Sequence, residues 1–258
     1  MWGCILKSKI KSKRTVAIKR GPKATVVDAP DLITIVLLCD SPGYRMKSYG
    51  ALPLIAINEK YKLIDLQIHA IQQAFKNFEI ILCIGFDAEK ICKYVRSKYN
   101  KLNIRIVENQ LFESSNSCES TRVAINNTFN HKLLICDGNL LLNKQVLSLI
   151  DDKDSCILVE NKPSDNLEIK VNVDDKHQAQ YFSFGAHRTW SEIVFLNTQE
   201  SIEIFRKFLS SHDNKNKFIF EALNELVRSR VSLRCIYNEN TLHKISNIKT
   251  YRSIKELT

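Results

Sequence analysis

Apolar runs of strand length alternate with amphipathic helical segments from residue 31 onward, and this alternation restricts the fold more than any other feature. The run at residues 32–39 is continuously apolar, which is typical of a strand covered on both faces. Residues 62–75 place apolar side chains at helical spacing. Further strands are predicted at residues 79–85 and 103–109. Because parallel strands need crossover connections, this order favours a mainly parallel sheet with helices on both faces.

The second half of the chain is less regular but predicts the same class. Strand-like runs occur at residues 155–160, 168–173 and 190–197, and two helices and a last strand follow them. No internal repeat or low-complexity linker divides the chain. We therefore predict one α/β domain at residues 31–258, a three-layer sandwich with a mainly parallel, Rossmann-like mixed sheet. An N-terminal arm at residues 1–30 precedes it.

The arm holds most of the net charge. The formal charge of the whole chain is +10, yet eight of its 38 basic residues, and no acidic residue, lie before Asp28. The remaining 30 basic residues nearly balance the 28 acidic ones. Such an arm is either a solvated extension or an anchor for an acidic partner, which could be a protein or a nucleic acid. No aromatic residue interleaves these charges, as a base-stacking platform would require.

Cysteine usage and hydropathy bear on the compartment. Eight cysteines occur without a C-x-x-C pair, and Cys39, Cys83 and Cys136 lie in apolar runs, where a thiol behaves as a small hydrophobe. We expect reduced, mostly buried thiols rather than a disulfide framework. No apolar run reaches the roughly 20 residues that span a bilayer, so no membrane partner is expected. The predicted location is cytoplasmic, or virion-associated if the Lys-, Asn- and Ile-rich composition reflects a viral source.

The loop after the first predicted strand carries the first candidate chemistry. It spans residues 40–47 and contains Gly43 and Arg45. Glycine lets a backbone approach a phosphate closely, and arginine binds phosphate oxygens through two parallel hydrogen bonds. These residue types suggest phosphate binding, although a Pro-Gly turn followed by a basic residue is also common without it.

Six patterns in a fixed order extend this signal over about residues 31–258. They are IVLLCDSPGYRMKSYGALPLIAINEKYKLIDLQIHAI (35–71), EIILCIGFDAEKICKYV (79–95), IRIVENQLFESSNSCESTRVAI (104–125), LLICDGNLLLNKQVLSLI (133–150), FIFEALNEL (218–226) and NIKTYRSIKEL (247–257). The first contains a strand, a loop ending in G-x-R-M and a helix, and the fourth lies where a G-D metal-binding turn is expected. Together they resemble the sugar-phosphate and phosphocholine nucleotidyltransferases, which have the nucleotide-diphosphosugar transferase (GT-A-like) fold.

The resemblance implies a reaction and its partners. A phosphomonoester, such as a sugar phosphate or phosphocholine, attacks the α-phosphate of a nucleoside triphosphate and releases pyrophosphate. Mg²⁺ would be the cofactor of an active enzyme, because hard oxygen ligands hold the ion and the ion neutralises phosphate charge. An inactive member would need no cofactor.

The same resemblance implies a nucleotide-binding set. Ser41, Gly43 and Arg45 fall in the loop that cradles the triphosphate, and Arg45 would also act in catalysis on the β- and γ-phosphates. Asn116 and Ser120 match the segment that faces the base and the sugar. Each of these assignments comes from the alignment of the patterns above.

At its catalytic positions the chain departs from the family pattern. The family lysine falls at Leu52, and Lys47 could replace it only by reaching across the loop. The two metal-binding aspartates fall at Asn139 and Asn247, which keep an oxygen ligand but lose the charge. Asp137 is the nearest carboxylate, and strand alternation predicts that it points to the other side.

We therefore predict a nucleotidyltransferase-like protein whose catalysis is weak or lost, a pseudoenzyme. Activity through Asp137, Asp40 or Lys47 stays open at this point. A non-catalytic structural or binding subunit that docks through its basic arm is a second hypothesis, and a GT-A glycosyltransferase is a third. A geometric condition follows for the metal positions: Asp137, Asn139 and Asn247 should converge near the loop at residues 43–45.

Overall fold

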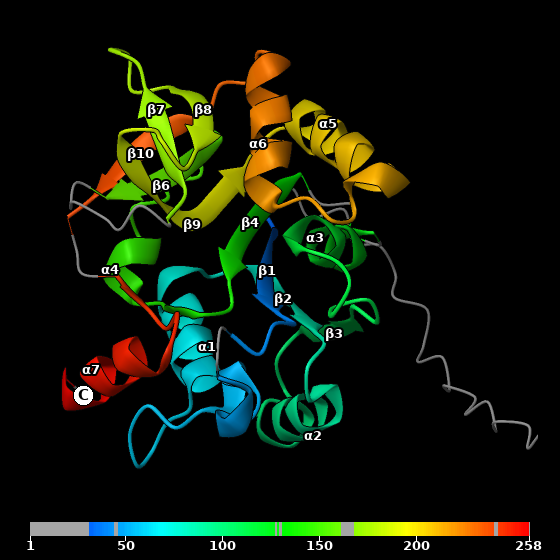
Figure 1. The fold of residues 1–258 in the computed structure, drawn as a ribbon, viewed down its shortest axis with the longest axis vertical. Coiled ribbons are helices and arrows are strands. Elements are labelled where there is room, and N and C mark those ends of the chain that lie inside the picture. The colour runs from blue at the N-terminus through cyan, green and yellow to red at the C-terminus, as the bar shows by residue number, and fades with distance from the viewer. Residues whose placement is uncertain are drawn as a thin grey trace, which may run out of the picture.

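The fold is described by a computed structural model for residues 31–43, 46–126, 128, 131–160, 168–239 and 242–257. A nine-stranded sheet crosses the molecule in the order β10-β6-β9-β4-β1-β2-β3, with β7 paired to β9 and β8 to β7. Helices cover both of its faces (Figure 1). The predicted three-layer α/β fold with a mainly parallel mixed sheet is therefore confirmed. The predicted basic arm at residues 1–30 lies outside the described residues.

The first half of the chain builds the parallel part of the sheet. Strand β1 lies in its middle, paired in parallel with β2 on one side and β4 on the other, and β3 continues beyond β2. The helices between them are the crossovers that parallel pairing requires. The bounds are β1 (Ile33–Cys39), α1 (Leu63–Ala74), β2 (Phe78–Ile84), α2 (Ala88–Lys98), β3 (Ile104–Glu108), α3 (Ser117–Ile125) and β4 (Lys132–Asp137).

The second half adds antiparallel strands and the last helices. Strand β9 pairs antiparallel with both β4 and β6, and β10 pairs in parallel with β6. Two short strands, β5 and β11, form a separate small sheet. The bounds are β5 (Leu140–Leu141), α4 (Lys144–Leu147), β6 (Cys156–Glu160), β7 (Lys170–Val173), β8 (Ala179–Ser183), β9 (Arg188–Leu196), α5 (Gln199–Ser210), α6 (Ile219–Arg228), β10 (Arg234–Asn238), β11 (His243–Lys244) and α7 (Ile248–Leu257).

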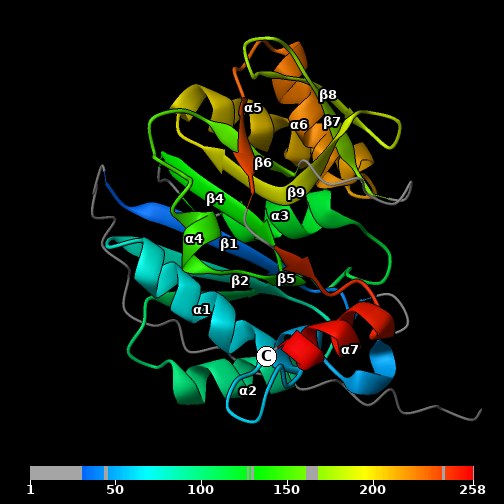
Figure 2. The same ribbon diagram turned by 90° about the vertical axis from the view of Figure 1, so that its left-hand side faces the viewer.

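Side chains of β1 alternate between two hydrophobic cores. Ile35 and Leu37 pack with apolar residues of α1, α2 and α4, whereas Val36 and Leu38 pack with α3, α5 and α6. Figure 2 shows these two groups of helices on opposite sides of the central strands. Every residue of β1 is buried. The continuous apolar run in the sequence follows from this double coverage, because each fully buried aliphatic side chain contributes about 1.5–3 kcal/mol.

A third, smaller core brings the C-terminal segment to the loop after β1. Ile245, Tyr251 and Ile254 pack there with Met46 and Leu52. The Tyr251 hydroxyl also donates a hydrogen bond of 2.8 Å to the carbonyl oxygen of Ala56. The residues just before α7 are thereby held near the carboxyl ends of the central strands.

The described part of the chain can be compared with the expectations for its cysteines and helices. Its seven cysteines are free, and six of them are buried. None of its helices is long and apolar enough to cross a membrane.

One buried carboxylate joins α1 to α2. Asp65 accepts hydrogen bonds from the Lys62 backbone N–H at 2.9 Å and from the hydroxyls of Tyr94 and Tyr99 at 2.8 and 2.7 Å. The Lys98 ammonium lies 2.9 Å from the same carboxylate. Burial alone would raise the pKa of Asp65, but these hydrogen bonds, led by that of Tyr99, outweigh it and hold the pKa below its ordinary value.

Replacing this carboxylate should destabilise the fold in a pH-dependent way. We expect Asp65→Asn to lower the free energy of unfolding by about 2–3 kcal/mol at pH 7, because charged hydrogen bonds are lost inside the protein. The folded-state pKa is lower than the unfolded one, so the stabilisation is full above the unfolded value of about 4 and is lost as the pH falls through the folded value. Urea denaturation should show a smaller difference in the free energy of unfolding between wild type and Asp65→Asn at pH 3 than at pH 7.

The same substitution at an exposed carboxylate is the control. Asp175 is exposed, and we expect Asp175→Asn to change the free energy of unfolding by less than about 0.5 kcal/mol. Equal effects of the two substitutions would contradict the role given to Asp65.

Candidate functional site

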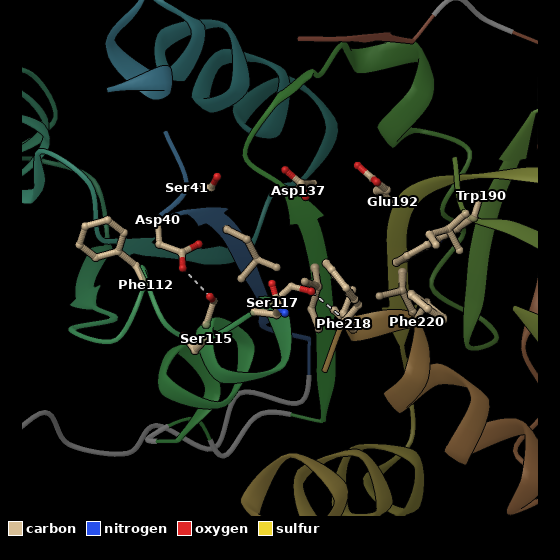
Figure 3. Close-up of a pocket in the computed structure, with 17 residues that line it drawn as sticks. Asp40, Ser41, Phe112, Ser115, Ser117, Asp137, Trp190, Glu192, Phe218 and Phe220 are labelled. Carbon is tan, nitrogen blue, oxygen red and sulfur yellow. Dashed lines mark hydrogen bonds between the residues drawn. The ribbon is translucent and has the colours of Figure 1, made fainter. Parts of the chain in front are cut away.

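A cavity of about 310 Å³ opens beyond the carboxyl ends of β1 and β4. The order of the strands reverses between these two, since β2 and β3 follow on one side of β1 and β4 lies on the other. In open α/β sheets, ligands bind at such a switch point. The polar part of the lining consists of Asp40, Ser41, Ser115, Asn116, Ser117, Ser120, Asp137 and Glu192 (Figure 3).

The other wall of the cavity is aromatic and aliphatic. Trp190, Phe218 and Phe220 contribute to it, and Phe112 lines the cavity as well. The rings of Phe218 and Phe220 stack with centroids 6.0 Å apart and an interplanar angle of 16°. Phe218 is 48% exposed. The cavity therefore combines carboxylates with accessible aromatic faces.

A hydrogen-bond network fixes Asp40 at the end of β1. Its Oδ2 accepts a bond of 2.5 Å from the Ser120 hydroxyl and one of 3.1 Å from the Asn109 side-chain amide. Gly85, after β2, makes room for this arrangement, because a Cβ there would lie 2.9 Å from the Asp40 Cβ and 2.7 Å from that of Phe112. The end of β1, the end of β3 and the start of α3 thus share one network.

The turn after β4 is held tightly against the end of β1. The Gly138 N–H donates a hydrogen bond of 2.9 Å to the Leu38 carbonyl oxygen. A Cβ at Gly138 would collide with that oxygen and would lie 2.7 Å from the Cys39 Sγ. From α1, the buried Gln67 amide donates to the carbonyl oxygens of Gly138 at 3.0 Å and Leu140 at 2.8 Å. The turn is therefore held by β1 on one side and by α1 on the other, and this fixes the position of Asp137 just before it.

Asp137 is an enclosed carboxyl in acidic surroundings. Burial, followed by the charge of Glu192, raises the pKa of Asp137 above its ordinary value. The Lys244 ammonium and the Asn139 N–H, which lies 3.1 Å from Oδ1, act in the opposite direction. Desolvation and a neighbouring like charge both disfavour the ionised form.

Glu192 reaches the cavity from a distorted strand. Its φ is 58°, in the left-handed region, and the β6–β9 pairing shifts register there. Such bulges re-aim side chains and are common beside functional sites. The Lys244 Nζ lies 2.6 Å from Glu192 Oε1. Burial would lower the pKa of Lys244, but Glu192 and then Asp137 outweigh it and raise that pKa, so the side chain stays charged.

The structure gathers four of the predicted nucleotide-binding residues. Ser41, Asn116 and Ser120 line the main cavity. Gly43 lines a smaller cavity that also contains Ser41 and Asp137. The Ser41 hydroxyl accepts a hydrogen bond of 3.2 Å from the Gly43 N–H, which shapes the loop.

Two basic residues of the loop were also predicted to bind the phosphates. Arg45 lies outside the described residues. Lys47 is on the surface, with its side chain 64% exposed and its ammonium 3.5 Å from Glu113 Oε1. It is not among the residues that line the main cavity.

The three predicted metal positions are divided between two cavities. Asp137 and Asn139 line the small cavity near Gly43. Asn247 lines an adjoining cavity together with Glu192. The Asn247 Oδ1 accepts a hydrogen bond of 3.1 Å from the Thr250 N–H at the start of α7.

The resemblance implies Mg²⁺, and the oxygen atoms near Asp137 are the possible ligands for this ion. Mg²⁺ prefers charged oxygen ligands in near-octahedral geometry. The Asn139 Oδ1 is a buried oxygen without a hydrogen-bond partner and could serve as one ligand. The Lys244 ammonium, however, already brings positive charge to the carboxylates of Glu192 and Asp137. Among the residues that the structure describes, no group of three His, Cys, Asp or Glu side chains could hold a metal ion. The residues present therefore do not fit a magnesium site.

From the sequence, Glu192 was indicated only as one of two remaining acidic residues, with Glu221, that could lie near the cleft, and Lys244 was not indicated. Glu192 carried a usable signal, because it is an acidic residue inside an apolar run of strand length. Lys244 carried none, since its position depends on a two-residue strand, β11, that pairs with β5.

Known structures share this fold, although no protein-family profile and no curated protein sequence matches the chain. CTP:phosphocholine cytidylyltransferase (LicC) from Streptococcus pneumoniae matches with a TM-score of 0.71 at 15% identity, over 88% of this chain and 99% of that one. The inositol-1-phosphate CTP transferase from T. maritima has a TM-score of 0.70 at 13% identity, over 88% and 96%. A UDP-glucose pyrophosphorylase complexed with UDP-glucose has a TM-score of 0.67 at 12% identity, over 88% and 98%. The chain therefore has the nucleotidyltransferase fold.

Enlarging Gly138 should disturb the turn that positions Asp137. We expect Gly138→Ala to lower the free energy of unfolding by about 1–3 kcal/mol, because the added methyl group must displace the end of β1. Thermal and urea unfolding measure this loss. Gly185→Ala is the matched control, since a Cβ there meets no atom within 4 Å. Equal losses in the free energy of unfolding for the two variants would contradict the view that the close approach of Gly138 to β1 stabilises this turn.

Proposed function

We propose that this chain is a nucleotidyltransferase-like protein that binds a nucleotide beyond β1 and β4, and that its transfer of a nucleotidyl group is weak or lost. One observation carries the second half of the proposal: the Lys244 ammonium lies 2.6 Å from Glu192 and interacts electrostatically with Asp137. Catalysis of this type needs dense positive charge on the reacting phosphates, usually from a divalent ion. A lysine paired with Glu192 uses its charge inside the protein instead.

The nucleotide half of the proposal rests on the main cavity. Its position at the switch point of the sheet is where such folds bind ligands. In this proposal the loop of Ser41 and Gly43 meets the phosphates through its backbone, and Asn116 and Ser120 face the base and sugar. Arg45 supplies positive charge for the triphosphate, and Lys47 would add to it only by leaving Glu113 and reaching across the loop. Asp137 is an acidic group of the same cavity.

The lining favours a phosphocholine-like acceptor over a sugar phosphate. Carboxylates of Asp137 and Glu192 share the cavity with the aromatic side chains of Trp190, Phe218 and Phe220. Aromatic faces and carboxylates together attract an alkylammonium group, whereas a sugar would be held by hydrogen bonds to its hydroxyl groups.

Calorimetric titration with each nucleoside triphosphate, with Mg²⁺ and with EDTA, tests the proposal together with an assay of pyrophosphate release. We expect binding of at least one nucleotide in EDTA. Pyrophosphate release in the presence of phosphocholine should be about 0.1 per second or slower, against about 10 per second for a typical enzyme. Fast, Mg²⁺-dependent release would contradict the loss of catalysis.

Two other outcomes would replace the proposal. Binding of nucleotide-diphosphate sugars alone would indicate a glycosyltransferase. Absence of any nucleotide binding would favour a structural subunit that docks through the basic arm.

A blocking substitution locates the binding site. Ser41 is exposed and lines the main cavity. We expect Ser41→Trp to weaken nucleotide binding at least about tenfold, a change of about 1.4 kcal/mol, because the indole fills the entrance. Ser97 is exposed on α2, outside that cavity, so Ser97→Trp should leave the affinity unchanged. Equal affinities of the two variants would place the nucleotide elsewhere.

A further inference from the structure

Two carboxylates from neighbouring strands meet beside the cavity. Asp137 ends β4, and Glu192 lies in β9, which pairs with β4. Figure 3 shows both side chains pointing to the same side of the sheet. The positive φ of Glu192 and the bulge around it give its carboxylate this direction. Two such charges need a cation, since enclosed carboxylates are costly unless they are paired.

The chain supplies that cation from its C-terminal part. Lys244 lies in β11, where it pairs with Leu140 of β5. Leu140 comes only three residues after Asp137 in the chain. The Ile245 N–H donates a hydrogen bond of 2.9 Å to the Asn139 carbonyl oxygen, which fixes β11 to the turn. The Lys244 side chain is 30% exposed and that of Glu192 is 20% exposed, so their contact of 2.6 Å is partly shielded from solvent.

We infer that the Lys244 ammonium is a built-in cation that takes the place of a divalent metal ion at Asp137 and Glu192. A divalent ion bound by these carboxylates would lie close to the ammonium and be repelled by it. Removal of the ammonium leaves the two carboxylates, together with the buried Asn139 Oδ1, which has no hydrogen-bond partner and lines the small cavity with Asp137. Those are the hard oxygen ligands that Mn²⁺ and Mg²⁺ prefer. The wild-type protein thus excludes divalent ions, and a change at one residue admits them.

Mn²⁺ binding without nucleotide tests this directly, with the free ion counted by electron paramagnetic resonance. We expect the intact protein to bind Mn²⁺ no more tightly than its Asp137→Asn variant does. Lys244→Ala should bind at least about tenfold more tightly than wild type. Adding Asp137→Asn to Lys244→Ala should abolish the gain. No nucleotide is present, so a failure of the proposed nucleotide binding would leave these results unaffected.

Control variants separate the ammonium's role from general effects of charge and folding. Lys249 is an exposed lysine that lines the same adjoining cavity, and Lys249→Ala should show no gain. Lys244→Arg keeps the positive charge and should also show none. Lys244→Gln, which keeps most of the side chain's length, repeats the test if circular dichroism shows that the alanine variant is unfolded.

Two results would overturn the inference. The first is that wild type binds Mn²⁺ as tightly as folded Lys244→Ala or Lys244→Gln does, and that Asp137→Asn binds it more weakly than wild type. The other is the same affinity in Lys244→Ala or Lys244→Gln as in Lys249→Ala.

Discussion

The close approach of Gly138 to the end of β1 is the constraint on which the rest of the site depends. Its N–H bonds to the Leu38 carbonyl oxygen, and any side chain there would collide with β1. This contact fixes the turn after β4, and the turn in turn presents Asp137 to the cavity. It also leads into β5, the strand that pairs with β11 and brings in Lys244. A steric requirement at one glycine therefore sets the positions of an acidic and a basic group that are far apart in the chain.

The electrostatics of the site follow from this arrangement. Two paired strands hold Asp137 and Glu192 close together, and burial, followed by the charge of Glu192, raises the pKa of Asp137. The Lys244 ammonium lies 2.6 Å from Glu192 and also interacts electrostatically with Asp137, so it offsets part of the negative charge of these two carboxylates. In the proposed function, this ion pair is the reason why nucleotidyl transfer is weak or lost.

The sequence predicted the elements better than the site. A strand that is covered on both faces, such as β1, needs a continuous run of apolar residues. Such a run can be recognised in the sequence without knowledge of distant contacts. Ser41, Asn116 and Ser120 lie in the cavity because the ends of parallel strands meet at one edge of the sheet. Glu192 and Lys244 depend on a bulge and on a two-residue strand, and such features arise only from tertiary packing. The roles of Arg45, Asn139 and Asn247 rest on the resemblance and stay predictions.

The central claim is that an internal ammonium, and not a metal ion, balances the carboxylates of this site. A crystal of the wild-type protein soaked in Mn²⁺ with a nucleoside triphosphate, measured for anomalous scattering, tests it most directly. We predict no anomalous peak within about 2.5 Å of the Asp137 carboxylate, the range of metal–oxygen bonds, and an ammonium in contact with Glu192. A peak shared by Asp137 and Asn139, with Lys244 turned away, would contradict the claim.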